Sequence, residues 1–283
     1  MSAPLITVGI PVYNGARTIK RAIDSALDQS YPNVEVVVSD NASTDRTGEI
    51  CEQCAAADSR VKYVRQQTNV GPVENFRIAF SHARGELYMW LGDDDWLDLD
   101  YLQVASEILT KDPSVALVAG RAQYYRDGQP IRYGKKFSIT DATPLRRVVS
   151  YLHHVKDNGI FHGLMRRADI PPKAIPYFLA GDWLVIASQA YRGKLLTLDE
   201  IVVHRDLGGA SKSRAELVST LRLPPWTARF PSTAIMVGAF QYFLRDPEVA
   251  TDATPLSRLA LSSGAAGVLA VRGARRFAKK YLR

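Results

Sequence analysis

The chain has 283 residues, of which 46% are apolar and 23% charged, and its formal net charge is +7. This composition is ordinary for a folded soluble protein, and no apolar run reaches the roughly 18 residues of a membrane-spanning helix. The N-terminal stretch MSAPLITVGIPVY lacks the basic start of a signal peptide, and two cysteines are too few for a disulfide framework, so we expect a cytoplasmic protein.

The first 120 residues alternate between apolar runs rich in β-branched residues and amphipathic helical patterns. The runs predict five buried strands, at residues 5–12, 34–40, 61–66, 86–91 and 115–120. The helical patterns begin near Ile19 and recur over about residues 45–57, 72–83 and 98–110. Strands that alternate with helices in this way form βαβ units, so we expect an α/β fold with a mostly parallel, Rossmann-like sheet flanked by helices.

After residue 120 this alternation changes. The sequence predicts a hairpin over residues 124–133, a helix over about 182–192 and a strand over 194–204. From about residue 212 the chain is mainly helical, with breaks at Pro224-Pro225, Pro231, Asp246-Pro247 and Pro255. We therefore divide the chain into residues 1–120, residues 121–213 and a helical C-terminal extension over 214–283.

Polar motifs follow four of the predicted strands at their carboxyl ends. They are PVYN (11–14), SDNASTD (39–45), RQQTNVG (65–71) and GDDD (92–95). The carboxyl ends of parallel strands meet at one edge of the sheet, which is where open α/β sheets bind ligands. The sequence therefore predicts a binding site at this edge.

Three consecutive aspartates, Asp93, Asp94 and Asp95, follow the apolar run ELYMWL. Their charges repel one another, and a cation would offset that repulsion; hard oxygen ligands favour Mg²⁺ or Mn²⁺. Such an ion could also clamp a diphosphate and neutralise its charge as it leaves. The alternative is a solvated acidic turn that only caps the helix beginning near Asp98.

These motifs together resemble the family 2 glycosyltransferases with a GT-A fold. The blocks TVGIPVYNG, VVVSDNASTDRT, NVGPVENFRIAF and GELYMWLGDDDW are similar to that family in order and spacing. FHGLMRRADI, GDWLVIASQA and HRDLGGASKS resemble its acceptor-side segment, catalytic-base helix and donor-closing loop. The resemblance covers residues 5–213. It implies transfer of a sugar, with inversion, from a nucleotide diphosphate to an acceptor hydroxyl, in the assembly of a bacterial surface polysaccharide or glycan.

The resemblance also implies roles for single residues. Asp40 would accept from the edge of the base, most often uracil, which favours a UDP-sugar donor. Asp93 would face the ribose and Asp95 the metal, although alignment on the DDW end moves the metal to Asp94. The residues expected to line the nucleotide-sugar pocket are Pro11, Tyr13, Asn14, Asp40, Asn69, Gly71, Asp93, Asp94 and Arg205.

On the acceptor side, Asp182 matches the position of the family's catalytic base. His162, Arg166 and Trp183 are the other acceptor-side candidates, but the first and last could be packing residues and Arg166 could cover a surface. Two positions depart from the family pattern. Leu207 stands where a His that reaches the metal or diphosphate is common, and Asp182-Trp183 replaces a common Glu-Asp pair, which leaves one acid as the base.

Two other functions fit an α/β nucleotide-binding fold. A nucleotidyltransferase would need a Gly-rich phosphate loop after the first strand, where the sequence offers only Gly15. A nucleotide-sugar-binding protein without turnover would not need so complete a set of motifs.

The positive charge is concentrated in the last twelve residues, RGARRFAKKYLR, which hold six Lys and Arg and leave +1 for residues 1–271. A nucleic-acid-binding body would spread such charge over a face, so we expect no nucleic acid partner. Phe277, Ala278, Tyr281 and Leu282 could share one helix face, a pattern typical of segments that dock onto an anionic membrane. This predicts a peripheral protein at the inner face of the plasma membrane that meets a lipid-linked glycan acceptor; a solvated tail or an oligomer contact is the alternative.

Overall fold

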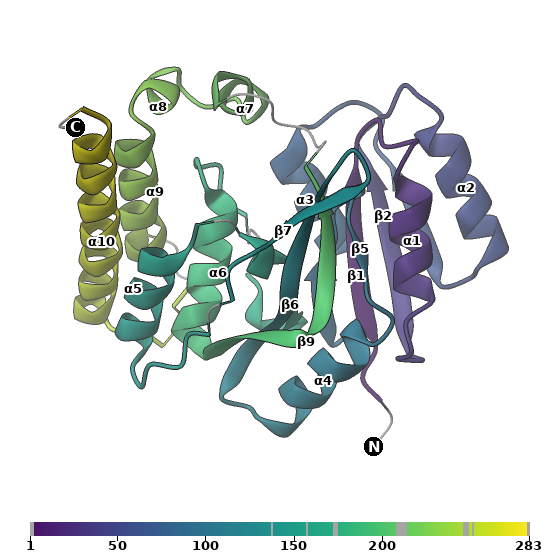
Figure 1. Ribbon diagram of the computed structural model, residues 1–283, viewed down its shortest axis with the longest axis horizontal. Coiled ribbons are helices and arrows are strands. Elements are labelled where there is room, and N and C mark those ends of the chain that lie inside the picture. Colours follow the sequence, from purple (N-terminus) through teal and green to yellow (C-terminus); the bar gives the residue numbers. More distant parts are fainter. Residues whose placement is uncertain are drawn as a thin grey trace.

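The computed structural model describes residues 3–136, 138–156, 158–171, 175–207, 214–245, 249–250 and 252–281, with the side chains of Arg214 and 275–281 excepted. One nine-stranded sheet runs through the molecule, with helices on both faces (Figure 1). The strand order is β3-β2-β1-β4-β8-β6-β9-β5, and β7 pairs with β6 at the side.

The first half of the sheet is parallel throughout, as the sequence predicted. Its strands are β1 (Ile6–Val12), β2 (Val34–Asp40), β3 (Val61–Arg65) and β4 (Leu87–Trp90). The helices that connect them are α1 (Ile19–Leu27), α2 (Thr47–Ala57) and α3 (Pro72–Ser81). Every residue of β1, β2 and β4 is buried, which is what helices on both faces impose on a parallel strand.

The second half of the sheet holds all the antiparallel pairs. β8 (Leu164–Arg166), which the sequence did not reveal, lies antiparallel between β4 and β6 (Val115–Arg126). β9 (Lys194–Asp206) runs parallel to β6, and β5 (Trp96–Leu97) pairs antiparallel with β9. Since β6 crosses residue 120, the predicted boundary there falls inside a strand of the common sheet.

The predicted hairpin is confirmed. β6 turns into β7 (Gln129–Tyr133) through Asp127 and Gly128, whose φ angles are 52° and 75°. Two positive φ values are what a tight two-residue hairpin turn requires.

The helices of the second half lie on both faces of the sheet, and two of them pack against the C-terminal extension. α4 (Tyr101–Lys111) precedes β6, and α6 (Gly181–Arg192) confirms the predicted helix over 182–192. α5 (Pro144–His154) was not predicted, although Thr143 caps it and Pro144 begins it. α5 contacts both α6 and the last helix of the chain.

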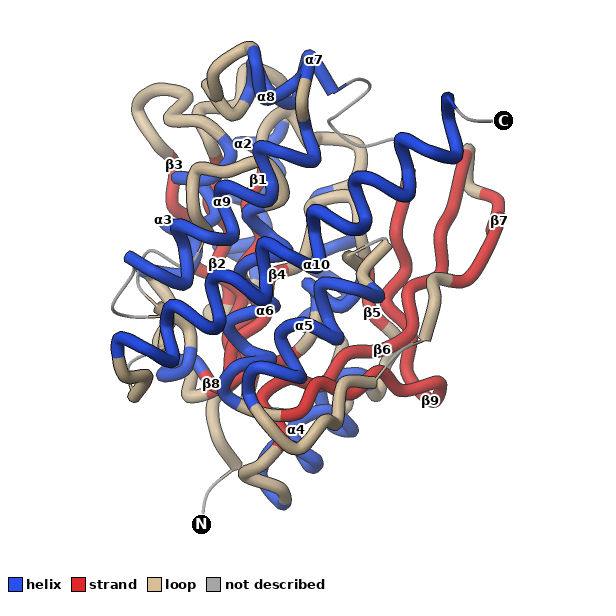
Figure 2. Tube along the Cα trace, turned by 90° about the vertical axis from the view of Figure 1, so that its left-hand side faces the viewer, coloured by secondary structure: helices blue, strands red, loops and turns tan. Residues whose placement is uncertain are grey.

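The C-terminal extension is helical, as predicted. It consists of α7 (Arg214–Thr220), α8 (Trp226–Arg229), α9 (Pro231–Arg245) and α10 (Pro255–Tyr281), of which α9 and α10 lie side by side (Figures 1 and 2). Pro231 and Pro255 begin helices, and the predicted break at Asp246-Pro247 lies outside the described residues. Within the described part of the chain, no helix has the length and apolar character needed to cross a bilayer.

Alternate residues of β4 face two separate cores. Tyr88 and Trp90 point into the core formed with α3, α5, α6, α9 and α10. Leu87, Met89 and Leu91 point into the core formed with α1, α2 and α4. The Trp90 indole stacks on Phe161 with ring centroids 5.3 Å apart and an interplanar angle of 7°. This contact fixes the short 3-10 turn Gly159–His162 against the strand that leads to the three aspartates.

Candidate active site

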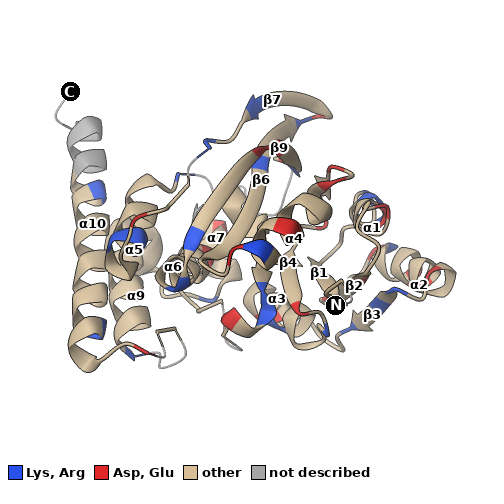
Figure 3. Ribbon diagram, turned by 90° about the horizontal axis from the view of Figure 1, so that it is seen from below, with Lys and Arg blue, Asp and Glu red and all other residues tan. Residues whose placement is uncertain are grey.

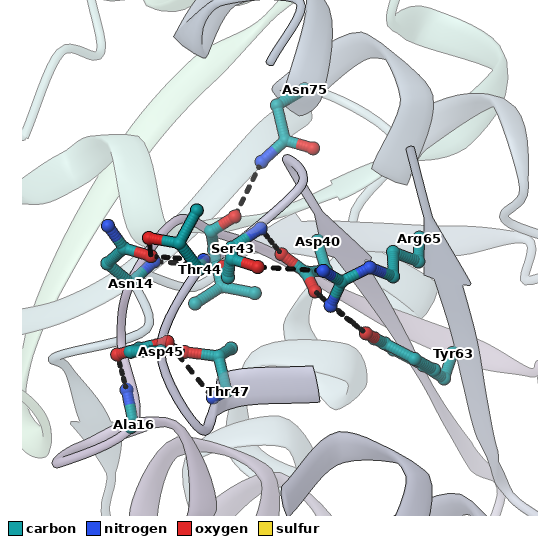
Figure 4. Close-up of polar contacts among 11 residues, drawn as sticks. Asn14, Ala16, Asp40, Ser43, Thr44, Asp45, Thr47, Tyr63, Arg65 and Asn75 are labelled. Atoms are coloured by element: carbon teal, nitrogen blue, oxygen red, sulfur yellow. Dashed lines mark hydrogen bonds and ion pairs between the residues drawn. The ribbon is translucent and has the colours of Figure 1, made fainter. Parts of the chain in front are cut away.

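The loops after β1 and β2 are joined by a polar network at the carboxyl edge of the sheet (Figure 4). Asn14 lies in the left-handed region with φ 56°; its backbone N–H donates to Ser43 Oγ at 2.9 Å. The Asn14 side-chain oxygen accepts from Thr44 N at 2.8 Å. Asp45 accepts from the backbone N–H groups of Ala16 and Thr47 at 3.2 and 3.0 Å. The two loops therefore form one rigid unit.

Asp40 ends β2 with a fully buried side chain that has three internal donors. Its carboxylate accepts from Ser43 N at 2.9 Å, Tyr63 Oη at 2.7 Å and Arg65 Nη1 at 3.0 Å (Figure 4). The sequence did not single out Tyr63 or Arg65, which come from the neighbouring strand β3. A base edge that donates to Asp40 would have to share its carboxylate with these three donors, so base recognition by Asp40 stays a prediction.

Asn69 and Gly71 shape the loop between β3 and α3. Asn69 Oδ1 accepts from Gly71 N at 2.9 Å and from Asn41 Nδ2 at 3.1 Å, which ties this loop to the one after β2. Gly71 has φ +90°, a conformation that a residue with a Cβ rarely adopts. Pro11 is buried in β1, whereas the Tyr13 side chain beside it is 48% exposed at the same edge.

The three aspartates lie in the turn directly after β4. A Cβ at Gly92 would stand 2.7 Å from Asp95 Oδ2 and 2.9 Å from Asp94 Oδ1, so glycine is what allows the two carboxyl groups to gather. The Asp95 side chain is 1% exposed. None of the three caps a helix, because α4 begins only at Tyr101 and has no side-chain cap. The structure thus argues against a mere capping turn.

Burial and mutual repulsion make these carboxyl groups hard to ionise. Burial, followed by the charge of Asp94, raises the pKa of Asp93 to about 7. Burial, followed by the charge of Asp95, raises the pKa of Asp94 to about 6. Burial also raises the pKa of Asp95, although the neighbouring Arg205 guanidinium opposes the shift. A bound cation would lower the free energy needed to keep these carboxyl groups ionised.

Asp95 has one engaged oxygen and one free oxygen. Arg205 Nε lies 3.3 Å from Asp95 Oδ2, and His162 Nε2 lies 3.4 Å from the same atom. Asp95 Oδ1 is buried and has no hydrogen-bond partner. A buried carboxylate oxygen without a partner is costly, so it is a natural ligand for a cation.

His162 supports this interpretation. Its Nδ1 lies 3.0 Å from the backbone oxygen of Trp90, which can only accept, so Nδ1 carries the hydrogen. Burial, together with the charge of Arg205, holds the pKa of His162 well below its usual range, so the ring is neutral. The lone pair of Nε2 then faces Asp95, an arrangement that a proton or a cation between them would stabilise. His162 is 4% exposed and lies 3.4 Å from Asp95, which favours the alternative of a packing residue over an acceptor-side one.

The donor set for a metal is incomplete by itself. Among the described residues, no group of three or more His, Cys, Asp and Glu side chains is placed to hold an ion. The residues present fit a divalent cation whose remaining ligands come from a bound diphosphate and water, with Asp95 as the anchor.

A stacked frame supports the turn from the other side. Trp96 stacks on His204 with ring centroids 4.9 Å apart, and the Arg21 guanidinium covers Trp96 at 3.7 Å from the ring centroid. Arg21 Nη2 also donates to the Asp94 backbone oxygen at 2.8 Å, and His204 Nε2 lies 2.8 Å from Asp98 Oδ1. These contacts join α1, β5 and β9 around the aspartates.

Asp182 lies in the first turn of α6, after Ala180 in the left-handed conformation. Asn158 Nδ2 donates to Asp182 Oδ2 at 2.8 Å, and the buried Tyr151 hydroxyl donates to Asn158 Oδ1 at 2.9 Å. Burial raises the pKa of Asp182, whereas the Asn158 hydrogen bond and the charge of Arg205 oppose the shift. Asn158 and Tyr151 were missed because a lone Asn after an unpredicted helix carries no sequence signal.

Two acceptor-side candidates have structural partners. Arg166 pairs with Leu87, at the start of β4 and away from the aspartates, and its guanidinium donates to the backbone oxygens of Leu109 and Val115 at 2.6 and 2.7 Å. This favours the alternative of a structural residue and corrects the acceptor-side prediction. The Trp183 ring is half-buried and is covered by Arg272 of α10 at 5.2 Å. Leu207 is 43% exposed, and the rest of the predicted closing loop, residues 208–213, lies outside the described residues.

This geometry agrees with the comparison with known families. Residues 7–170 match the model for Glycosyl transferase family 2, which is more than half of the chain. The chain therefore belongs to this family, which confirms the predicted class, a glycosyltransferase. Members of the family generally use a divalent metal.

Curated relatives match over part of their length. The chain is 35% identical over 98 residues to Glycosyltransferase GlyA of Streptococcus pneumoniae, covering 35% of this chain and 14% of that protein. It is 30% identical over 128 residues to the putative teichuronic acid biosynthesis glycosyltransferase TuaG of Bacillus subtilis, covering 45% and 51%. The matches to these two relatives thus span from about a seventh to about half of the relatives' length.

Solved structures confirm the fold class. The crystal structure of S. aureus TarS 1–349 superposes with a TM-score of 0.63 at 17% identity, covering 98% of this chain and 73% of that one. The complex of the same protein with UDP-GlcNAc gives a TM-score of 0.59 at 18% identity, covering 98% and 91%. This likeness shows the predicted GT-A fold.

Proposed function

We propose that this protein transfers a sugar from a UDP-sugar to an acceptor hydroxyl with inversion at the anomeric carbon. One observation carries the proposal: the charge of Arg205 acts on both Asp95 and Asp182, two acids that lie 87 residues apart in the sequence. Arg205 contacts Asp95 at 3.3 Å, and its charge also lowers the pKa of Asp182, so the acids expected to hold the diphosphate and the acid expected to deprotonate the acceptor lie within electrostatic reach of one cation. A one-step displacement needs the donor and the general base close together, which this arrangement would allow.

Residues 1–120 would form the donor half and residues 121–213 the catalytic half. In the donor half, the rigid loops around Asn14, Asp40 and Asn69 would receive the nucleotide. The complexes of TarS with UDP and with UDP-GlcNAc support a UDP-sugar for a protein of this fold. Pro11, Tyr13 and Gly71 would complete the pocket.

Asp95 would hold Mg²⁺ or Mn²⁺ through its free oxygen, with Asp94 as the alternative ligand. Bound there, the metal supplies charge neutralisation for the departing diphosphate. Arg205 already contacts Asp95 and would donate to the same phosphates. Asp93 would face the ribose.

Asp182 would act as the general base. It takes the proton of the acceptor hydroxyl as that oxygen bonds to the anomeric carbon and the bond to the diphosphate breaks. Asn158 would act as a positioning residue, because its amide holds Asp182 Oδ2 at 2.8 Å and favours the ionised form. Trp183, next in the chain, would border the acceptor.

The names of relatives suggest the biological setting. TuaG is named for teichuronic acid biosynthesis, and a further relative is the chondroitin synthase of Pasteurella multocida, 33% identical over 115 residues that cover 41% of this chain and 12% of that protein. We therefore propose a role in bacterial surface polysaccharide assembly, in the cytoplasm, with a glycan or lipid-linked glycan as acceptor.

The test is a turnover assay with a panel of nucleotide sugars and saccharide acceptors. We expect acceptor-dependent release of UDP, with the product in the inverted anomeric configuration. Pyrophosphate exchange instead of UDP release would show a nucleotidyltransferase. Tight binding of UDP-sugars with no product from any acceptor would show a binding protein, and either result would contradict the proposal.

A further inference from the structure

The segment that contains α8 presents aromatic and basic side chains to solvent. Trp226 is 45% exposed and Phe230 is 53% exposed, and Arg222 and Arg229 beside them are exposed as well. The Arg229 guanidinium lies 5.6 Å from the Phe230 ring centroid. We call these four residues the aromatic edge. Exposed apolar side chains that gather into a patch are typical of an interaction surface.

The sequence from α8 onward is poor in acidic residues, although Glu216 lies in the neighbouring helix α7. Residues 217–245 contain three arginines and no Asp or Glu, and residues 253–283 contain no Asp or Glu either. In Figure 3 the charged residues on the ribbons of α9 and α10 are basic, whereas α3 carries both signs. A partner for this surface should therefore be anionic and should accept partly inserted aromatic rings.

The aromatic edge lies at the end of the molecule where the site opens. Figures 1 and 2 share a vertical axis, and both place α7, α8 and the C-terminal end of α10 at the top and the N-terminus of the chain at the bottom. β1 begins near that N-terminus and runs upward, so the carboxyl edge of the parallel strands is also at the top.

We propose that the aromatic edge docks onto an anionic lipid bilayer and so turns the site toward the membrane. Trp and Phe insert at the interface between head groups and acyl chains, and each basic residue near an anionic surface adds about 1 kcal/mol of attraction. The purpose of this docking rests on the proposed function, because a lipid-linked acceptor would be presented at the membrane surface.

The first residue of the basic tail has partners within the fold, whereas the membrane role of the tail stays a prediction. Arg272 is engaged within the fold: its guanidinium donates to the backbone oxygens of Leu152 and Val155 and covers Trp183. Removing residue 272 would therefore disturb the site itself. The predicted apolar face of Phe277, Ala278, Tyr281 and Leu282 lies outside the described side chains, so the docking surface is argued from α8 alone.

The experiment is co-sedimentation of the full chain with vesicles of phosphatidylglycerol and phosphatidylcholine, against pure phosphatidylcholine. We expect binding only to the anionic vesicles, weakened by salt. Trp226→Ala with Phe230→Ala, and separately Arg222→Glu with Arg229→Glu, should each reduce binding at least tenfold. Leu256→Ala, 78% exposed at the other end of α10, and Lys62→Glu, exposed on β3, are the matched controls and should bind normally.

UDP titration and thermal melting of each variant verify that the site and the fold are intact. The proposal is overturned if the aromatic-edge variants bind vesicles like the wild type, or if deletion of 275–283 alone abolishes binding that those variants retain. It is also overturned if the wild type binds no vesicles and the aromatic edge instead holds a dimer, seen by sedimentation equilibrium. Vesicle binding without sugar transfer would leave the docking in place and contradict only the proposed function.

Discussion

Two sets of acids differ in how many hydrogen bonds and positive charges the fold provides for their carboxylates. Glu35 in β2 accepts from the Thr7 hydroxyl at 2.6 Å and from Arg84 N at 2.7 Å. Burial would raise the pKa of Glu35, but these hydrogen bonds and the Arg84 charge bring it below its usual value. The pKa of Asp45, an exposed acid in the loop after β2, is likewise lowered by the hydrogen bonds that its carboxylate accepts. Such acids serve the fold.

The second set consists of Asp93, Asp94, Asp95 and Asp182. Burial raises the pKa of each, and Asp95 Oδ1 has no partner. In their ionised forms these acids therefore destabilise the folded protein, which is typical of groups that act on a ligand. Substitutions in the first set should reduce stability and leave activity unchanged. Substitutions in the second set should reduce activity and leave stability unchanged or higher.

The largest effect is expected for Asp95→Asn. An amide is a poor metal ligand and leaves the departing diphosphate without its counter-charge, so transfer should fall by about 10³. The affinity for UDP in Mn²⁺ should drop to the value measured in EDTA. Isothermal titration with and without Mn²⁺ measures this, and Asp112→Asn, on the exposed loop before β6, is the control. Equal wild-type affinity in Mn²⁺ and EDTA would contradict a metal role.

Asn158→Ala should reduce the transfer rate by about 10- to 100-fold, because a misplaced general base loses part of the rate gain it supplies. Because the Asn158 amide lowers the pKa of Asp182, its loss should move the acidic limb of the kcat/KM profile to higher pH. The KM for the donor should change little. Ser188→Ala, in the helix α6 that also carries Asp182, is the control. A lower rate with an unmoved pH profile would show a merely structural role.

Glu35→Gln should lower stability by about 2 to 3 kcal/mol, because buried donors lose an ionised partner. For a chain of this size the melting temperature should fall by about 5–10 °C. The folded pKa of Glu35 is lowered, so the loss should be full at neutral pH and shrink as the pH falls through that value. The rate per folded molecule should be unchanged. Glu107→Gln, on the exposed face of α4, should change neither quantity.

Asp93→Asn should raise the melting temperature of the metal-free protein by about 2–4 °C at pH 8. The folded pKa of Asp93 is about 7, above its unfolded value, so the contribution of Asp93 to stability is full at low pH and lost as the pH rises through 7. The gain should therefore disappear near pH 4. Melting curves in EDTA from pH 4 to pH 8 measure this gain in melting temperature. A gain that is independent of pH would contradict the contrast between the two sets of acids.

The donor half could be predicted from the sequence because its structure is local. Each strand and helix of residues 5–97 shows its own periodicity, and parallel strands bring Asn14, Asp40 and Asp95 to one edge whatever the rest of the chain does. The family motifs added the prediction that Asp182 is the general base.

The second half resisted prediction because its contacts are distant in sequence. β8 has three residues, too few to show a period, and its place between β4 and β6 is set by pairing over many tens of residues. The same reason hides Asn158, which reaches Asp182 from another segment, and the burial of His162 behind Asp95. Arg166 could not be told from an acceptor-binding residue until its partners on α4 and β6 were known.

The most direct test of the contrast between acids that stabilise the fold and acids that act on a ligand is the Asp182→Asn variant. Its transfer rate is measured together with its affinity for UDP and its melting temperature. The amide keeps the size of the side chain and removes only the basic oxygen. We predict a rate at least 10² lower, with unchanged UDP affinity and a melting temperature equal to or above that of the wild type. Near-normal transfer to a good acceptor would contradict the account and would move the base elsewhere, with Asp206 as the next candidate.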